Sequence, residues 1–194
     1  MANSLRSNAD GTMSVLNGSG TEVANFPSTA PQQVNIGAKG ITLGTALTAS
    51  GTYIDFTGIP SWAKRITVMF YGVSTNGVSS VQVQLGSGSI QTTGYVYSAC
   101  VMTNAGASVG AQYTTGFGIS GGGPSSSRSG ICSIINTSTN LYIASMVGSF
   151  TDVGSGISGG GYVTISGTLD RIRITTVNGT DTFDAGTINI MYEG

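Results

Sequence analysis

The chain contains no histidine and few charged side chains, and these two shortages exclude much of enzyme chemistry. Without histidine there is no Ser-His-Asp triad, no Cys-His pair and no histidine-ligated metal. Charged residues make up 8% of the 194, against about 25% in an average soluble domain. The seven lysines and arginines are scattered and the net charge is −1, so we expect no nucleic-acid partner.

Long apolar runs are also missing. No stretch approaches the roughly 18 apolar residues of a membrane-spanning helix, and the first residues contain no apolar segment of the signal-peptide type. We therefore expect no membrane insertion and synthesis in a reducing cytoplasm. The only cysteines, Cys100 and Cys132, lie among small and apolar residues, so buried free thiols are expected rather than a disulfide. With two cysteines and no histidine, neither a structural zinc nor any cofactor is expected.

Glycine is abundant, with 31 residues, and small polar residues alternate with Val, Ile, Tyr and Phe. This composition favours strands and tight turns over helices. The segments 64–72 (KRITVMFYG) and 81–85 (VQVQL) alternate, so Val81, Val83 and Leu85 should point inward and the glutamines between them outward. About ten or eleven short strands at a spacing of roughly 8–15 residues predict an all-β fold, an antiparallel β-sandwich of jelly-roll-like kind.

Three connections carry more specific expectations. One turn of helix is expected in 58–65 (GIPSWAKR), and a hairpin connection in 177–186 (VNGTDTFDAG) because it contains Asn-Gly. The string GISGGG occurs at 118–123 and at 156–161, and each copy completes a G-x-G-x-x-G pattern. That pattern binds a dinucleotide only where its third glycine opens a helix, and no helix is predicted after either copy. We interpret both copies as long flexible connections at the ends of the sandwich.

Residues 1–40 differ in composition from the rest. They contain two of the four prolines and isolated apolar residues without a sustained period. Such a segment can hardly bury a core of its own. We therefore expect an extended N-terminal arm in 1–40, ordered against its own oligomer or a larger assembly, and a β-sandwich head domain in 41–194.

Paired carboxylates remain as a route to hydrolysis, because a glycosidase needs two acids that flank the bond. Asp181 and Asp184 are close in sequence, and Asp170 could approach them across a hairpin. The alternative is structural: Asp170 and Asp184 cap turns and pair with Arg171, Arg173 or Arg65. The same acids could bind calcium, although their spacing matches no EF-hand loop. We favour the structural role and expect no catalytic residue.

Two blocks of the sequence carry a family resemblance. The first is IDFTGIPSWAKRITVMFYGVSTNG at 54–77, and the second is GTLDRIRITTVNGTDTFDAGTINIMYEG at 167–194. Both resemble the C-terminal β-domain of tailed-bacteriophage and prophage fibre proteins, which are tail-fibre or virion structural proteins. The resemblance covers roughly 41–194. It implies a non-enzymatic, homotrimeric fibre or decoration located on the virion, attached to phage capsid or tail proteins through residues 1–40.

Two other functions are open. Tyr95, Tyr97, Tyr113 and Tyr162 lie in segments rich in Ser, Thr, Asn and Gly, which suit weak contacts with a host-surface glycan. The alternative for these tyrosines is packing within the sandwich or between subunits. The third hypothesis is a polysaccharide depolymerase that uses Asp181 and Asp184.

Overall fold

The computed structural model describes residues 4–9, 12–26, 40–119 and 121–194. Within these ranges every regular element is a β-strand and every strand pair is antiparallel, as the composition predicts. The chain divides into two compact units, Met1–Ala38 and Lys39–Gly194. Residues 27–39, which belong to the predicted arm, lie outside the described residues.

The first unit contains β1 (Ser4–Ser7), β2 (Met13–Leu16) and β3 (Glu22–Phe26). The strands of the second unit are, in chain order, β4 (Thr42–Leu43), β5 (Leu47–Thr48), β6 (Tyr53–Thr57), β7 (Arg65–Thr75), β8 (Val81–Ser87), β9 (Ser89–Ile90), β10 (Val96–Met102), β11 (Ser108–Tyr113), β12 (Phe117–Ile119), β13 (Arg128–Ser138), β14 (Leu141–Phe150), β15 (Ser155–Thr164), β16 (Arg171–Thr176) and β17 (Phe183–Glu193).

The first unit is a three-stranded sheet in the order β1-β2-β3, so the expected extended arm is not confirmed. Its β2–β3 turn is set by Asn17, whose Oδ1 accepts hydrogen bonds from the backbone two and four residues further on. Polar contacts hold the strands together: Asn8 donates to the buried Ser14, and Ser14 donates to Glu22. A search for apolar periodicity does not detect this sheet, because hydrogen bonds between side chains, rather than a stripe of apolar residues, join its strands.

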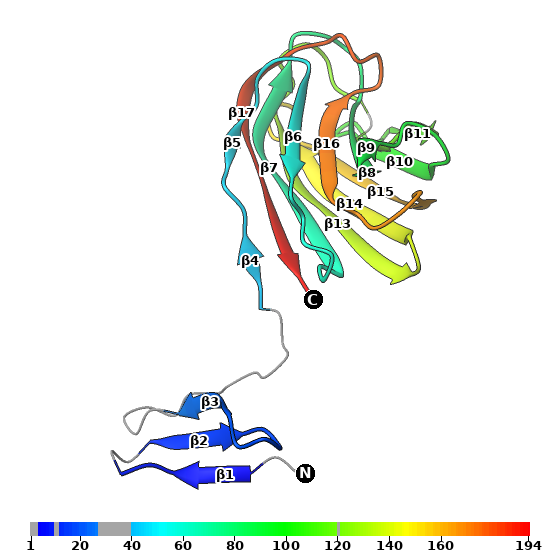
Figure 1. Ribbon diagram of the computed structural model, residues 1–194. Helices are drawn as coiled ribbons and strands as arrows, with labels where there is room; N and C mark the ends of the chain where they lie inside the picture. The colour runs from blue at the N-terminus through cyan, green and yellow to red at the C-terminus, as the bar shows by residue number, and fades with distance from the viewer. Residues whose placement is uncertain (1–3, 10–11, 27–39, 120) are drawn as a thin grey trace. The chain divides into compact units, whose positions relative to one another are not determined.

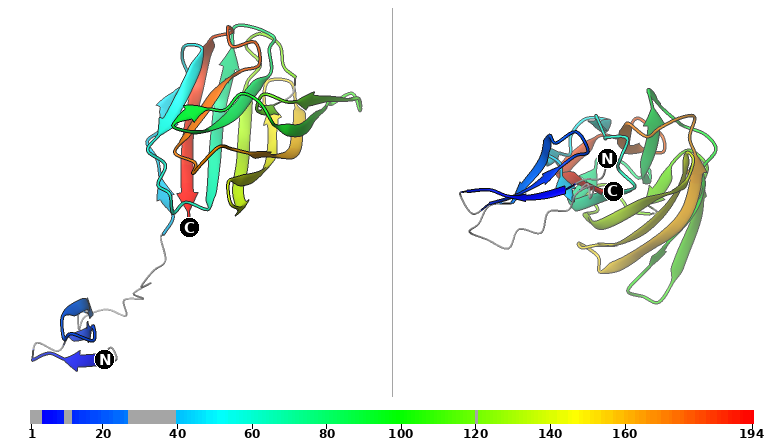
Figure 2. Two further views of the ribbon diagram at one scale, coloured as in Figure 1. Left: turned by 45° about the vertical axis from the view of Figure 1, so that its right-hand side comes forward. Right: turned by 60° about the horizontal axis from the view of Figure 1, so that its bottom comes forward.

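The second unit is built from two larger sheets. One has nine strands, in the order β11-β10-β15-β14-β13-β7-β17-β4 with β5 also on β17; the other has five, β12-β8-β16-β6 with β9 on β8. Figures 1 and 2 show β6 and β16 as a layer in front of β7, β13 and β14. The apolar residues of both sheets belong to one buried cluster. This arrangement is consistent with a β-sandwich.

The predicted alternation in the strands is confirmed. In β7, Ile66 and Val68 are fully buried, whereas Tyr71 on the opposite face is 79% exposed. In β16, Ile172 and Ile174 are fully buried, and Arg171 and Arg173, which alternate with them, face the other way. Each such burial contributes about 1.5–3 kcal/mol, so these inward rows fix which side of each strand meets the core.

Two of the predicted connections are wrong. The segment 58–65 forms a hydrogen-bonded turn, in which Ala63 N–H donates to the carbonyl of Pro60, and no helix follows. The segment 177–186 is not a hairpin, because β16 and β17 belong to different sheets. Its turn is held to the loop before β8 instead: Asp181 accepts hydrogen bonds from Ser79 N–H and from the side chain of Asn178.

The two GISGGG copies also differ from the expectation of flexible connections. The copy at 156–161 lies inside β15, hydrogen-bonded to β10 on one side and β14 on the other. The copy at 118–123 begins in β12 and continues into a loop, and its Ser120 lies outside the described residues. In β15 the glycines allow close approach to β10, since a Cβ on Gly161 would lie 2.1 Å from the carbonyl oxygen of Val96.

Candidate functional site

The four tyrosines proposed for glycan contact do not form a common site. Tyr95, Tyr97 and Tyr113 are buried, and the rings of Tyr95 and Tyr97 pack on Phe117 at centroid distances of 5.1 and 5.3 Å. Burial raises the pKa of the Tyr95 and Tyr97 hydroxyls, the response of a phenol surrounded by core. A ring in the core has no face for a ligand, so these three are corrected to packing residues. Tyr162 alone, at 48% exposure, stays a candidate.

Asp170 and Asp184, two of the acids considered for hydrolysis, are engaged in structural contacts. Arg171 donates to both carboxylate oxygens of Asp170, with distances of 2.8 and 3.2 Å, and this hydrogen-bonded pair lowers the pKa of Asp170. Asp184 accepts a hydrogen bond from the hydroxyl of Ser74. A glycosidase acid needs a raised pKa, which is the opposite of the shift at Asp170.

Asp181 likewise has a structural role. Its two oxygens accept hydrogen bonds from Asn178 at 2.6 Å and from Ser79 N–H at 2.9 Å, and the hydrogen bond from Asn178 lowers its pKa. Asp181 therefore makes the contacts of a residue that holds a turn.

Among the described residues, no three Cys, Asp or Glu side chains gather into a group that could hold a metal ion. The same part of the chain contains no helix long and apolar enough to cross a membrane.

The two cysteines are free thiols, as predicted, but only one of them is buried. Cys132 is fully buried on the core side of β13, and burial raises the pKa of its thiol to about 12. Cys100 is half-buried and belongs to the outward row of β10. The two side chains therefore point to opposite faces of the same sheet, which prevents a disulfide.

A surface without charge covers one end of the nine-stranded sheet. The strands β10, β11, β13, β14 and β15, all fully described, contain a single charged residue, Arg128, and its side chain is buried. We call the outward-pointing residues of these five strands the uncharged face. Its large exposed apolar and aromatic side chains are Val96, Met102, Ile131, Ile135, Ile143, Val147 and Tyr162.

The strand register sorts the uncharged face into rows. Ile135 pairs with Ile143, Ile143 with Tyr162, and Tyr162 with Val96, so one apolar row crosses four adjacent strands. Directly paired side chains lie about 4.5–5.5 Å apart at Cβ, close enough to form a continuous surface. The next row contains only serines, glycine and glutamine: Ser133, Ser145, Gly160, Ser98 and Gln112.

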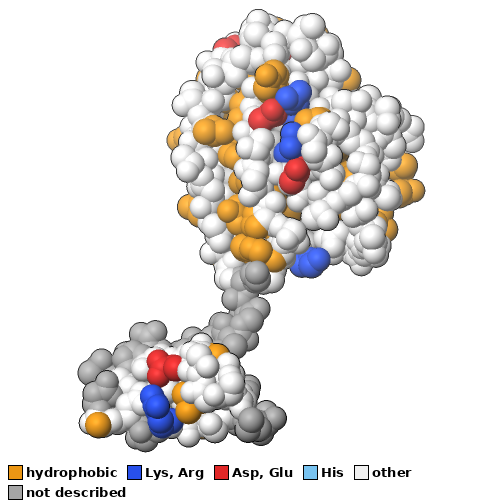
Figure 3. Space-filling model, in the orientation of Figure 1, with side chains coloured by type: hydrophobic (Ala, Val, Ile, Leu, Met, Phe, Trp, Pro, Cys, Tyr) orange, Lys and Arg blue, Asp and Glu red, His pale blue; other side chains and the backbone are white. Residues whose placement is uncertain are grey.

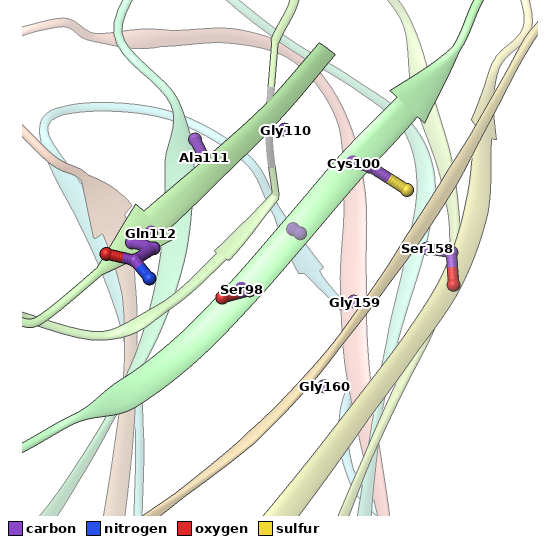
Figure 4. Close-up of a pocket in the computed structure, with 9 residues that line it drawn as sticks. Ser98, Cys100, Gly110, Ala111, Gln112, Ser158, Gly159 and Gly160 are labelled. Atoms are coloured by element: carbon purple, nitrogen blue, oxygen red, sulfur yellow. The ribbon is translucent and has the colours of Figure 1, made fainter. Parts of the chain in front are cut away.

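A shallow trough of about 520 Å³ lies where β10, β11 and β15 meet on the uncharged face. Figure 4 shows its lining, with Ser98 and Cys100 on β10, Gln112 on β11, and Ser158 beside the glycines of β15. The trough exists because the glycine-rich string places no side chains there. Its groups are hydroxyls, a thiol and an amide, so it has neither an acid–base pair nor a cation for phosphate. Chemically it can receive side chains of a partner.

Arg128, the single charged residue of these five strands, holds the neighbouring glycine-rich loop. The guanidinium of Arg128 donates to the carbonyls of Gly121 and Ser126, each at 3.1 Å, and lies 5.2 Å from the ring centre of Phe150. Burial lowers its pKa, and Nε has no hydrogen-bond partner in the described structure. Gly122 has no room for a side chain here, since its Cβ would lie 2.4 Å from the guanidinium. The sequence gives no signal for this contact.

No protein-family model, no curated protein and no solved structure matches the chain. Its function therefore has to be inferred from the chemistry of its surfaces and from the two sequence blocks.

Proposed function

We propose that the chain is a non-enzymatic structural protein of a tailed-bacteriophage virion: a short homotrimeric fibre or decoration. In this proposal residues 1–40 attach to capsid or tail proteins, and residues 41–194 form the exposed head, a sandwich of jelly-roll-like kind. The resemblance of 54–77 and 167–194 suggests the class of protein. The observation that supports assembly is the uncharged face.

The positions of the two resembling blocks fit this proposal. The first block contains β6 and β7, and the second contains β16 and β17; β6 pairs with β16, and β7 pairs with β17. Two ion pairs join the blocks, Asp55–Arg173 at 2.7 Å and Arg65–Glu193 at 3.1 Å. Segments separated by about a hundred residues thus form one structural unit, which favours a domain motif over two chance matches.

The uncharged face suits contact with further copies of the same chain. Five strands at a spacing of about 4.8 Å and seven residues at about 3.3 Å each give a face of roughly 20 by 20 Å, the size of patches that are often functional. A face without charge meets no like-charge repulsion from a copy of itself and loses no ion hydration on burial. The trough offers a recess for an apolar side chain such as Val147, which is 65% exposed.

Analytical ultracentrifugation of the full chain tests the self-contact. We expect the mass of three chains, and Val147→Asp should dissociate the assembly because it places a charge in the buried contact. The matched control is Val78→Asp, at a valine 72% exposed and outside the uncharged face, and it should leave the mass unchanged. A monomeric wild type at tens of micromolar, or equal behaviour of the two variants, would refute assembly through this face.

Attachment is tested separately on particles. A chain without residues 1–40 should fold and remain soluble but should no longer join virions, because the proposed anchor is gone. Normal incorporation of the shortened chain would overturn the anchoring role. Cryo-electron microscopy of particles that contain the full chain then decides between capsid and tail.

A further inference from the structure

The outward face of the five-stranded sheet is polar, unlike the uncharged face. The register places Gln84, Arg173 and Asp55 in one row across β8, β16 and β6. The next row contains Gln82, Thr175 and Tyr53. Over β6 and β16, which lie in front in Figure 1, Figure 3 shows cationic and acidic side chains beside one another.

The two glutamines point outward, as the alternation predicts, yet they are only 2% and 5% exposed. The chain between β11 and β12 passes over them. The hydroxyl of Thr115 donates to Gln82 Oε1 at 2.9 Å, and Gln84 Nε2 donates to the carbonyl of Thr115 at 2.8 Å. The glutamines therefore form the fixed floor of a groove, and Gln84 Oε1 keeps its acceptor capacity within the described residues.

The opposite wall is a rigid arrangement of three side chains. Arg173 makes two hydrogen bonds of 2.7 Å to Asp55, so the pair carries no net charge. Its guanidinium carbon lies 4.0 Å from the ring centre of Tyr53. Because Arg173 covers one face of this ring and 51% of Tyr53 is exposed, the other face is open to solvent.

Between these walls lies a groove of about 300 Å³. Thr92 and Thr115 line it from one side, Tyr53 and Arg173 from the other, and Asn178 closes an end. The lining thus combines one open aromatic face with hydroxyls, amides and a guanidinium, and its only charges are paired.

We propose that this groove binds a neutral oligosaccharide. An open tyrosine face stacks on the C–H face of a pyranose ring, and planar amide and guanidinium groups match the closely spaced donors and acceptors of sugar hydroxyls. A site that orients its ligand needs a few fixed polar groups, which the buried glutamines provide. The small volume suits a terminal sugar residue rather than the middle of a long chain.

Other ligand classes fit the lining less well. A phosphate or carboxylate needs an unpaired cation, whereas Asp55 already neutralises the charge of Arg173 and its carboxylate would repel a second anion. An apolar ligand would cover Gln84 Oε1 without offering it a donor, and a buried polar atom left without a hydrogen bond costs about 1–3 kcal/mol. The inference goes beyond the proposed virion role and stands without it, because the groove and the uncharged face lie on different sheets.

Ligand-detected NMR and calorimetric titration of the full chain test this proposal. The probes are the β-1,4 and α-1,4 tetrasaccharides of glucose, the tetrasaccharide of N-acetylglucosamine, and tetragalacturonate as an anionic comparison. We expect a neutral probe to bind with a dissociation constant on the order of 1 mM or below. Tyr53→Ala should weaken that binding about tenfold by removing the stacking face, whereas Tyr53→Phe should retain it.

The matched control is Tyr71→Ala, at an exposed tyrosine on the nine-stranded sheet, and it should bind like the wild type. Unchanged fluorescence of the single tryptophan, Trp62, shows that each variant is folded. The proposal is overturned if none of the neutral probes binds at 10 mM, if tetragalacturonate binds best, or if Tyr53→Ala binds as well as the wild type. Loss of binding in Tyr71→Ala would place the ligand elsewhere and overturn it equally.

Discussion

The glycine-rich strand β15 gives a sharp test of the fold, because two neighbouring glycines differ in the space around them. A Cβ on Gly161 would lie 2.1 Å from the carbonyl oxygen of Val96 and 2.6 Å from the Cα of Tyr97, both backbone atoms of β10. A backbone atom cannot rotate away as the end of a side chain can, so the Cβ introduced by Gly161→Ala has to push β15 and β10 apart. At Gly160 the nearest atom, a carbonyl oxygen, would lie at 3.8 Å, which is ordinary contact.

We therefore expect Gly161→Ala to lower the stability of the fold and Gly160→Ala to raise it. Overpacking typically costs about 1–3 kcal/mol, and we place Gly161→Ala at the upper end because the obstacle is backbone. That cost lowers the melting temperature by roughly 6–12 °C for a chain of this size. Gly160→Ala should raise stability by about 0.5–1 kcal/mol, since glycine inside a strand has more conformational entropy to lose than alanine.

Thermal and urea unfolding followed by the fluorescence of Trp62 measure both variants. Protein concentration is held equal, and the Val147→Asp background keeps assembly from contributing to the transition. A Gly161→Ala variant as stable as the wild type, or two variants destabilised to the same extent, would refute the close approach of β15 to β10.

Two further predictions concern buried groups. In the Val147→Asp background, where the uncharged face is not covered by another copy, iodoacetamide should modify Cys100 but not Cys132, as peptide mass spectrometry would show. Because burial raises the folded pKa of Cys132 to about 12, the stability that this thiol contributes should be complete below about pH 9 and decline towards pH 12, and Cys132→Ala should flatten that decline. Equal labelling of the two thiols would contradict the burial of Cys132. Arg128→Lys should speed hydrogen exchange in the loop 121–127, since an ammonium cannot reach both carbonyls, whereas Arg65→Lys at a half-exposed site should not. Unchanged exchange in that loop would show that Arg128 does not hold it.

Several features of the fold could be predicted from local pattern. Alternation in 64–72 and 81–85 correctly identifies the residues that face the core, because a strand sends successive side chains to opposite faces. The pairing of Asp170 with an arginine follows from the same kind of local proximity. The N-terminal sheet could have been suggested by the Asn-Gly turn at 17–18, which is a hairpin signal that composition alone obscures.

The candidate sites depend on contacts between distant segments, and the sequence does not indicate them. Nothing near Tyr95 or Tyr97 distinguishes a core tyrosine from an exposed one, since both kinds occur in alternating strands. Gln82 and Gln84 have the pattern of solvent-facing residues, and only the passage of Thr115 over them turns a flat strand surface into a groove floor.

The sequence by itself determined the class of fold, the inward face of each major strand and the scarcity of acid–base groups, because these follow from composition and a period of two. The tertiary structure decided which strands are neighbours. It placed a glycine string in the middle of a sheet rather than in a loop, sent the chain after β16 into the other sheet, and buried Arg128 beneath a glycine-rich loop. Such outcomes depend on the packing of residues far apart in the chain, and no local pattern encodes that packing.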